Sequence, residues 1–361
     1  MRSTVAGVAC GRHLDRDAVH DGIAGGDVAR RACVLPGPLL RLGYTVMSFQ
    51  ISVGVAFGED VRRIAREQID GAIAETNGSA AGSDAERIHS VRKRCKKLRG
   101  LLRLVRPCLG DVYARENTYF RDAARVLAPL RDTHVVAAAF DAVVGHFQGE
   151  FSPGTFEPLR SQLVRPEPQL TNLEPRLADV CGRMEAARGR IADWPLDGTE
   201  GPEAWRRGFE RTYRQARRAL AAAYDERTPE RFHEWRKSVK YHWYHTRLLS
   251  ALWDETIAGR AAAASTLGEL LGLHHDLAVL RATLVPQKTP ESRAGGLRES
   301  FIALVDRHLT HFEETARPHG LRLFAEKPSR IGSRYEKYWA VALEEVQGRG
   351  GAAVGQVRAS A

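Results

Sequence analysis

The sequence lacks the features that mark several classes of protein. It contains 5 cysteines, at positions 10, 33, 95, 108 and 181, and no two of them form a CxxC pair. Neither a disulfide framework nor a structural zinc site is therefore expected, and the pattern is typical of a reducing compartment such as the cytoplasm. No apolar run approaches the ~18 residues that a membrane-spanning helix needs, so none is predicted.

Aromatic and acidic residues are also scarce relative to the rest of the composition. Aromatic residues make up 7% of the 361 positions, and 44 Asp and Glu face 54 Lys and Arg, which leaves a formal net charge of +10. The hydrophobic content of 43% and the charged content of 27% are those of a folded chain. The positive surplus favours a polyanionic partner but does not say which polyanion.

Both ends of the chain lack a regular hydrophobic period. Residues 1–56 contain scattered Gly and Ala and no properly formed secretory signal. We expect this extension to be disordered or to include residues that precede the true start, for which Met1 and Met47 are both candidates. The Gly/Ala-rich tail, residues 347–361, is expected to be flexible.

Between these ends the hydrophobic period is helical. Runs of β-branched residues bounded by turn residues are nearly absent, so we predict an all-α fold. Breakers such as Ser152-Pro153-Gly154 and Pro318 to Gly320 separate the helical segments. The predicted helices span residues 59–76, 84–106, 111–147, 174–193, 202–224, 229–252, 256–284, 294–317 and 329–346.

The sequence repeats itself at an offset of 144 residues. This offset aligns His89 with His233 and keeps its register, without a gap, as far as Val135 and Val279. The repeat predicts two pseudo-symmetric halves, 57–200 and 201–346, each large enough for a four-helix bundle. Further aligned pairs are Arg63 and Arg207, Arg92 and Arg236, Lys93 and Lys237, Lys96 and Lys240, Arg103 and Arg247, and Asp132 and Asp276.

One predicted helix is strongly basic and contains no acid over two-thirds of its length. A solvated helix normally alternates opposite charges, because like charges four residues apart repel by roughly 0.2–0.5 kcal/mol. An anionic ligand would remove this repulsion, so the segment favours a polyanion site. The basic residues between His89 and Arg103 are Arg92, Lys93, Arg94, Lys96, Lys97, Arg99 and Arg103.

The apolar residues of the same helix fix which face is basic. Ile88, Val91, Cys95, Leu98 and Leu102 recur every three or four residues and predict a stripe that faces a core. The basic residues then share a neighbouring face that is roughly 21 Å long at 1.5 Å per residue. The second copy repeats this arrangement with His233, Arg236, Lys237, Lys240 and Arg247.

Two such faces related by the repeat would line a groove or channel suited to a chain of phosphates. Arg binds phosphate oxygens through paired hydrogen bonds, and Lys supplies a mobile point charge. The two histidines are expected to stay mostly neutral among cations and to gain charge when a polyanion binds. Each could instead be a residue at the start of a helix that bonds a local carbonyl.

Two motifs carry a resemblance to a known family. The pattern His89-x-x-Arg92-Lys93-x-x-Lys96-x-x-Arg99 recurs as His233-x-x-Arg236-Lys237-x-x-Lys240, and Leu130-Arg131-Asp132 pairs with His274-His275-Asp276-Leu277. These segments resemble the CHAD family, the conserved histidine α-helical domain, over about residues 57–346. The resemblance implies two four-helix bundles around a basic cavity that binds inorganic polyphosphate, and association with polyphosphate granules.

The candidate binding residues are those of the two basic faces and of further basic rows that could join them. The second copy departs from the first where Tyr241 replaces Lys97 and Trp243 replaces Arg99, which weakens its charge. The full set is His89, Arg92, Lys93, Lys96, Lys97, Arg99, Arg103, His233, Arg236, Lys237, Lys240, Arg247, Arg63, Arg207, Arg211, Arg214, Arg218 and Lys327.

Other chemistries receive less support from the sequence. Relatives of this domain are often fused to a phosphate-processing tunnel domain with an ExExK motif, which is missing here, so neither catalysis nor a cofactor is expected. His242-x-x-His245 and His274-His275-Asp276 suggest a metal site, but a basic pocket repels cations. Asp132 and Asp276 are expected to support basic side chains of their own bundles.

Nucleic-acid binding is the main alternative, because any basic groove attracts a phosphodiester backbone. The basic faces lack interleaved aromatic residues on which bases could stack, and no RNP motif or zinc finger is present. A scaffold that docks acidic proteins is a further possibility that the sequence leaves open.

Overall fold

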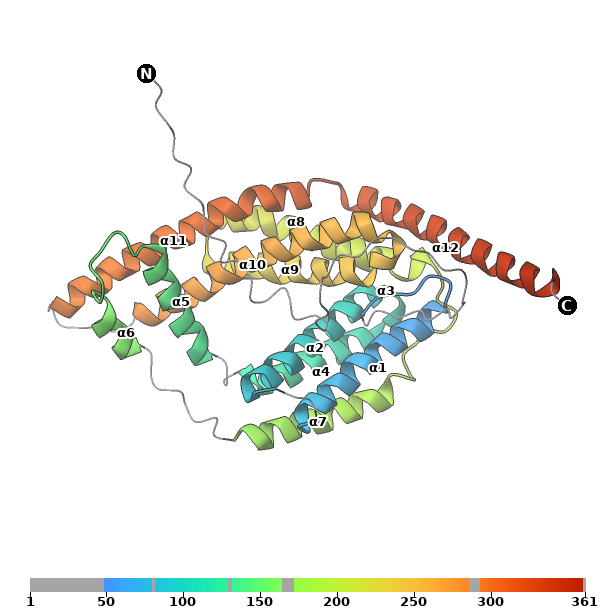
Figure 1. The fold of residues 1–361 in the computed structure, drawn as a ribbon, viewed down its shortest axis with the longest axis horizontal. Helices are drawn as coiled ribbons and strands as arrows, with labels where there is room; N and C mark the ends of the chain where they lie inside the picture. The colour runs from blue at the N-terminus through green and yellow to red at the C-terminus, as the bar shows by residue number, and fades with distance from the viewer. Residues whose placement is uncertain (1–48, 80–81, 129–131, 164–171, 286–292, 360–361) are drawn as a thin grey trace, which may run out of the picture. The chain divides into compact units, whose positions relative to one another are not determined.

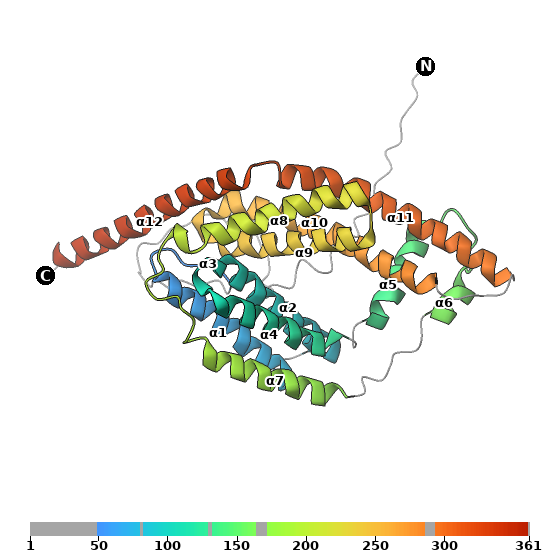
Figure 2. The same cartoon turned by 180° about the vertical axis from the view of Figure 1, so that it is seen from behind.

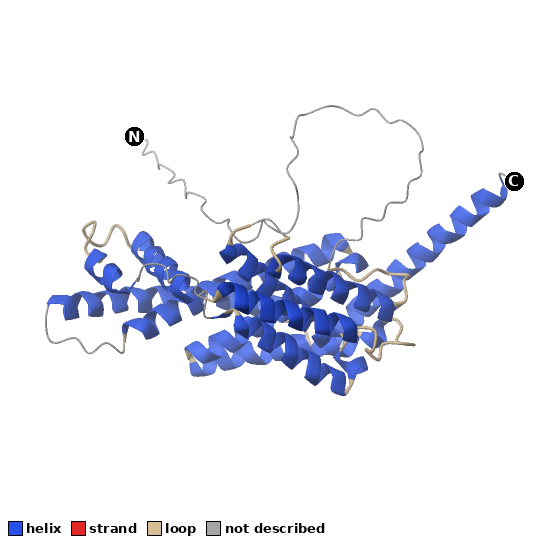
Figure 3. Cartoon of the chain, turned by 90° about the horizontal axis from the view of Figure 1, so that it is seen from below, coloured by secondary structure: helices blue, strands red, loops and turns tan. Residues whose placement is uncertain are grey.

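The computed structural model describes residues 49–79, 82–128, 132–163, 172–285 and 293–359 (Figure 1). All regular secondary structure within these ranges is helical, which confirms the predicted all-α class (Figure 3). The α-helices are α1 (Phe57–Thr76), α2 (Asp84–Leu104), α3 (Arg106–Leu109), α4 (Asp111–Val126), α5 (Asp132–His146), α6 (Glu157–Leu163), α7 (Leu173–Arg190), α8 (Arg206–Glu226), α9 (Pro229–Leu248), α10 (Asp254–Leu284), α11 (Arg293–Leu323) and α12 (Pro328–Ala359). Two short 3-10 helices are η2 (Pro202–Ala204) and η3 (Ser250–Leu252).

The first half forms a closed group of four helices. Helix α1 packs against α2 and α7, and α4 packs against the same two helices. Helix α2 begins at a capping box, in which the Ser83 hydroxyl accepts the N–H of Glu86 and the Glu86 carboxylate accepts the N–H of Ser83. The predicted stripe from Ile88 to Leu102 is buried in this group.

The second half forms a corresponding group from α8, α9, α10 and α11. Helix α9 packs against α8 and α10, α10 packs against α11, and the Tyr224 hydroxyl closes the group by donating to the Glu313 carbonyl (2.6 Å). Thr228 caps α9 by accepting the N–H of Arg231, and Pro229 occupies the first turn. Shifting α9 back by 144 residues places it at 85–104, so the two aligned basic segments form helices with nearly the same bounds.

Helix α5 departs from the repeat. The predicted continuous helix 111–147 is divided, because α4 ends at Val126 and α5 begins at Asp132. Helix α5 packs against α10 and α11, where the ring of Phe140 stacks on Phe301 with 4.2 Å between centroids. A second hydrophobic cluster therefore joins α5 and α6 to the second half, whereas α10 runs through the equivalent region as one helix.

The two halves meet at α2, which contacts both α8 and α9. A Cβ on Gly208 would lie 1.9 Å from the carbonyl oxygen of Leu104, and a Cβ on Gly100 would lie 2.9 Å from the Cβ of Tyr244. Only glycine allows backbones to approach this closely. The imidazole of His245 donates to the Gly100 carbonyl at the same contact (3.0 Å) and ties α9 to α2.

Three predictions about segment ends were wrong. Residues 49–56, expected to be disordered, pack on the second half: Phe49 and Ile51 are buried, and the Ile51 N–H donates to the Leu248 carbonyl (2.8 Å). Helix α11 passes through Pro318 to Leu323, since a proline removes only one helical hydrogen bond and Leu323 anchors the last turn. Helix α12 continues past residue 346 to Ala359.

The remaining end predictions concern residues 1–48, including Met1 and Met47, which lie outside the described part of the chain. Within the described part, no helix is both long enough and apolar enough to cross a lipid bilayer.

Candidate functional site

Most of the predicted basic residues form two rows on the helices where the halves meet. The α2 row consists of His89, Arg92, Lys93, Lys96, Arg99 and Arg103, and the α9 row consists of His233, Arg236, Lys237, Lys240 and Arg247. His89 and Lys237 are exposed and the others are half-buried, so every member retains contact with solvent.

The two rows lie close to one another. The guanidinium of Arg103 lies 3.8 Å from the centre of the Tyr241 ring, and that of Arg99 lies 5.9 Å from the same ring. Lys96 on α2 is also close enough to contribute to the electrostatic field at His233 on α9. Cations from both copies of the repeat therefore share one region beside the contact between α2 and α9.

Helix α4 positions the α2 row. The guanidinium of Arg92 donates to the Ala124 carbonyl (2.7 Å). Arg99 and Arg103 both donate to the side-chain oxygen of Asn117, at 3.2 and 2.6 Å. Because a single neutral amide holds two guanidiniums, their positive charge is retained while their orientation is fixed.

Helix α10 positions the α9 row by coming close to it. A Cβ on Gly268 would lie 3.0 Å from Cε of Lys240, and a Cβ on Gly272 would lie 3.5 Å from Nε of Arg236. The first copy has the small residues Ala124 and Ala128 at the equivalent positions of the repeat. Small residues thus occupy these positions in both copies, and those on α10 give the long basic side chains of α9 room.

Aromatic rings support the cations of the α9 row. The ammonium of Lys240 lies 4.7 Å from the Trp243 ring centre, and the guanidinium of Arg247 lies 5.1 Å from it. Such cation–π contacts stabilise a charge without neutralising it. Lys237 differs, because it forms an ion pair with Glu234 on its own helix (2.5 Å).

The two lead histidines have different surroundings. His89 is exposed, whereas His233 is half-buried and stacks on His275 of α10 with 4.2 Å between ring centroids. Burial lowers the pKa of His233, and Lys237 and Arg236 lower it further. His233 is therefore neutral at pH 7, as predicted, although burial contributes more than the cations.

His275 is shifted further in the same direction. Burial, followed by His233 and Arg236, lowers the pKa of His275 to about 4. The stacked pair thus places two neutral imidazoles, which can both donate and accept hydrogen bonds, at the start of the α9 row.

Lys97 and Arg63 do not lie with the rows, contrary to the prediction. Lys97 is only 7% exposed and its ammonium lies 5.2 Å from the Phe49 ring centre, on another side of α2. Arg63 forms ion pairs with Asp60 and Glu67, both at 2.7 Å. The contact of Lys97 comes from a segment distant in sequence, whereas the acids that pair with Arg63 lie three and four residues away in its own helix and could have been read from the sequence.

The remaining basic candidates belong to separate faces. The α8 row, Arg207, Arg211, Arg214 and Arg218, is exposed on the side of α8 opposite to its buried residues Phe209 and Ala216. Lys327 is exposed just before α12, which packs against α8 and η3.

The alternative metal sites receive no geometric support. His242 is buried beside Phe209, Tyr213 and Phe324, and His245 bonds the Gly100 carbonyl. No group of three potential ligands occurs among the described residues. Asp276 is half-buried on α10, and the side chain of Asp132 lies outside the described residues, so its expected supporting role is not addressed.

Two residues at the site, Asn117 and Arg121, were missed from the sequence, and His275 was considered there only as part of a family motif and of a metal site. Asn117 and His275 contact the rows directly. Arg121 on α4 is close enough to contribute to the lowered pKa of Arg99, although burial is the main cause. One available signal was the pair Gly268 and Gly272, four residues apart inside a helix, which indicates close approach of another group. Asn117 carried no comparable signal.

A family comparison identifies the class of protein to which this arrangement belongs. A model of the CHAD domain matches residues 63–285, a span that runs from α1 to the end of α10 and includes both rows. The chain therefore belongs to the CHAD family. A comparison with curated proteins found no match.

Proposed function

We propose that this protein binds inorganic polyphosphate along the α2 row and the α9 row, and that this binding localises it to polyphosphate granules in the cytoplasm. The observation that carries the proposal is the convergence of two basic rows from duplicated helices, one of which has no acid between His89 and Arg103. Membership of the CHAD family, which is linked to polyphosphate, supports the same ligand.

The chemistry of the rows suits a chain of phosphates. Guanidiniums held by Asn117 can offer paired N–H groups to phosphate oxygens, and the lysines add mobile charges. Binding of a polyanion would offset the repulsion between neighbouring cations and raise the pKa of His233 towards its ordinary value. We propose binding alone, with no catalytic step and no cofactor.

The proposal is tested by comparing polymers and variants at about 0.15 M salt, where nonspecific electrostatic binding is weak. Long-chain polyphosphate, single-stranded DNA and RNA are titrated into the wild-type protein and into the double variant Lys96→Gln with Lys240→Gln. We expect tighter binding of polyphosphate per phosphate, and about a tenfold or greater loss in the variant.

A matched control removes two cations elsewhere. Arg183 and Arg188 lie on α7, where they pair with Asp179 and Asp70. Arg183→Gln with Arg188→Gln should leave polyphosphate affinity within about twofold. Equal affinity for nucleic acid would contradict the proposed ligand, and equal loss in the control would contradict the proposed site.

The pH dependence gives a separate test of the histidines. Polyphosphate affinity should rise as the pH is lowered from 8 to 5.5, because His233 takes up a proton in the complex with the polymer. An unchanged pH profile in the variant His89→Gln with His233→Gln would remove the histidines from the site.

A further inference from the structure

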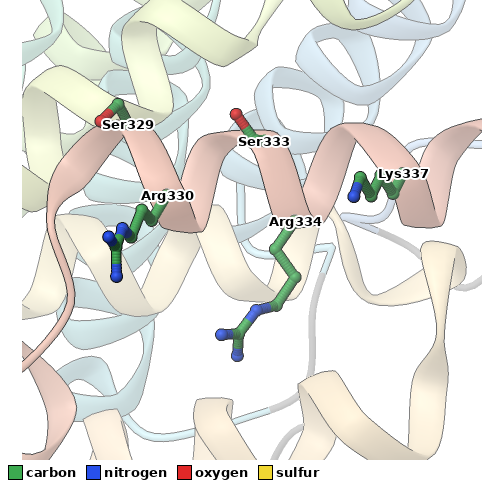
Figure 4. A pocket seen from close by; sticks show the side chains of 5 residues that line it. All are labelled: Ser329, Arg330, Ser333, Arg334 and Lys337. Atoms are coloured by element: carbon green, nitrogen blue, oxygen red, sulfur yellow. The ribbon is translucent and has the colours of Figure 1, made fainter.

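Helix α12 carries a second group of cations. Lys327, Arg330, Arg334 and Lys337 are spaced three or four residues apart, a spacing that places them on one side of a helix. All four side chains are exposed. Figure 4 shows Arg330 and Arg334 extending to the same side of α12, with Lys337 further along the helix. We call these four residues the α12 face.

Three cations of the α12 face have no side-chain partner among the described residues. Arg334 forms an ion pair with Glu326 (2.7 Å), whereas no hydrogen bond or ion pair joins the side chains of Lys327, Arg330 and Lys337 to another described residue. The nearby Glu336 is paired with Arg206 of α8. Of these two acids, Glu326 is thus engaged by Arg334 of the face itself, and Glu336 by Arg206.

A shallow pocket lies on the α12 face. It has a volume of ≈ 360 Å³ and is lined by Ser329, Arg330, Ser333, Arg334 and Lys337 (Figure 4). The Ser333 hydroxyl accepts a hydrogen bond from Arg206 (3.0 Å), which leaves its own hydrogen available to donate outwards. Two hydroxyls and three cations therefore border one solvent-accessible hollow.

Arg217 of α8 adds positive potential at the start of α12. Its guanidinium donates to the Glu326 carbonyl (3.3 Å), one residue before Lys327, and no carboxylate pairs with it among the described residues. Positive charge therefore continues from the α12 face onto α8, with Glu326 as the acid between Arg217 and Arg334.

The α12 face is distinct from the α2 and α9 rows. Helix α12 packs against α8 and η3, whereas the rows lie where α2 meets α9. Figures 1 and 2 show α12 on one side of α8, α9 and α10, and α1, α2 and α4 on the other. A ligand on this face would be separated from the rows by the second helical group.

We propose that the α12 face is a second binding site, for a short inorganic phosphate chain such as tripolyphosphate. Arg330 and Lys337 supply uncompensated charge, Arg334 supplies the N–H groups that Glu326 does not use, and the serines donate to phosphate oxygens. The hydroxyls and the guanidinium fork fit a ligand with many acceptor oxygens. Together with the proposed function, on which this consequence rests, one molecule would hold two polyphosphate segments and link chains.

Calorimetric titration with tripolyphosphate tests the site itself. The wild-type protein should show two classes of site. The variant Arg330→Gln with Lys337→Gln should lose one of them by about tenfold or more in affinity, and Lys96→Gln with Lys240→Gln should lose the other. The control Arg183→Gln with Arg188→Gln should retain both.

The outcomes separate this inference from the proposed function. Two unchanged sites in the α12 variant would overturn the inference, whatever the row variant does. A lost site in the α12 variant with no effect in the row variant would support the inference and contradict the proposed function. Thermal unfolding at the wild-type temperature in each variant shows that lost binding is not lost folding.

Light scattering with long-chain polyphosphate tests the linking of chains. The wild-type protein should produce a maximum of scattering at an intermediate ratio of protein to polymer, whereas the α12 variant should bind the polymer without this maximum. Equal scattering by the α12 variant would overturn the claim that the two sites link chains.

Discussion

The two copies of the repeat have kept one backbone arrangement but use it differently. Helix α2 turns leucines towards its core, at 98, 101 and 102, where α9 has His242, His245 and Thr246. On the basic side the contrast reverses, because the first copy has Arg99 where the second has Trp243. Helix α2 is thus more apolar inside and more cationic outside.

The difference shows that the two copies hold their basic side chains in place by different contacts. The α2 row keeps its guanidiniums in place through Asn117, whereas the second copy has Ala261 at the equivalent position. The α9 row relies instead on close packing against Gly268 and on the ring of Trp243. Tyr241, a replacement in the second copy, supports Arg103 of the first, so the copies now depend on each other.

The largest expected effect is a loss of stability in acid, caused by a buried histidine of the second copy. Burial lowers the pKa of His245 to about 3 from an ordinary value of 6.5. The unfolded chain therefore binds a proton that the folded protein rejects, so stability is complete above about pH 6.5 and falls as the pH drops towards 3. Full protonation of His245 would lower the free energy of unfolding by at most about 5 kcal/mol.

Urea unfolding at pH 7.5 and pH 5 measures this effect. The variant His245→Gln keeps a donor for the Gly100 carbonyl but cannot take up a proton, so its stability should depend less on pH than that of the wild type. An unchanged pH dependence would show that His245 is not responsible.

A smaller effect is expected where the copies touch. Gly208→Ala would place a methyl group 1.9 Å from the Leu104 carbonyl oxygen and force α8 away from α2. We expect a loss of about 3 kcal/mol, measured by chemical unfolding. Gly259→Ala is the control: nothing lies within 4 Å of a Cβ there, and helix propensity predicts a gain of up to about 1 kcal/mol. Similar effects of the two substitutions would contradict the close contact.

Equivalent substitutions in the two rows should differ in their effect on binding. Arg103→Gln removes a cation beside Arg99 and Lys96, whereas Arg247→Gln removes one from the less charged α9 row. We expect a loss in polyphosphate affinity of about tenfold for the first and about threefold for the second at 0.15 M salt. Equal polyphosphate affinity of the two variants would contradict the expected difference between the α2 row and the α9 row.

The smallest effect concerns the ring that joins the rows. Tyr241→Leu removes the aromatic face beneath Arg103 and should destabilise the protein by about 0.5–1 kcal/mol, while Tyr241→Phe should retain most of the wild-type stability. Thermal unfolding of both variants distinguishes a cation–π contact from simple packing, which leucine would preserve.

The sequence was most informative where its pattern is local. The period of α2 gave its buried stripe and its basic face, and the offset of 144 residues located α9 within one residue. It failed where a distant segment competes for a side chain, because Phe49 engages Lys97. The pairing of Arg63 with Asp60 and Glu67 was overlooked, although these acids lie three and four residues away in the same helix. The packing of α5 on the second half was also not predicted, because it depends on contacts with the distant helices α10 and α11.

The sequence by itself determined the all-helical class, the duplication and the faces on which cations lie, because helical periodicity and like-charge spacing act within a few residues. The tertiary structure alone decided which cations share a region, since that depends on where Gly100 and Gly208 let helices approach and on which distant side chains, such as Phe49, contact a cation. Contacts between residues far apart in sequence leave no periodic trace from which they could be read.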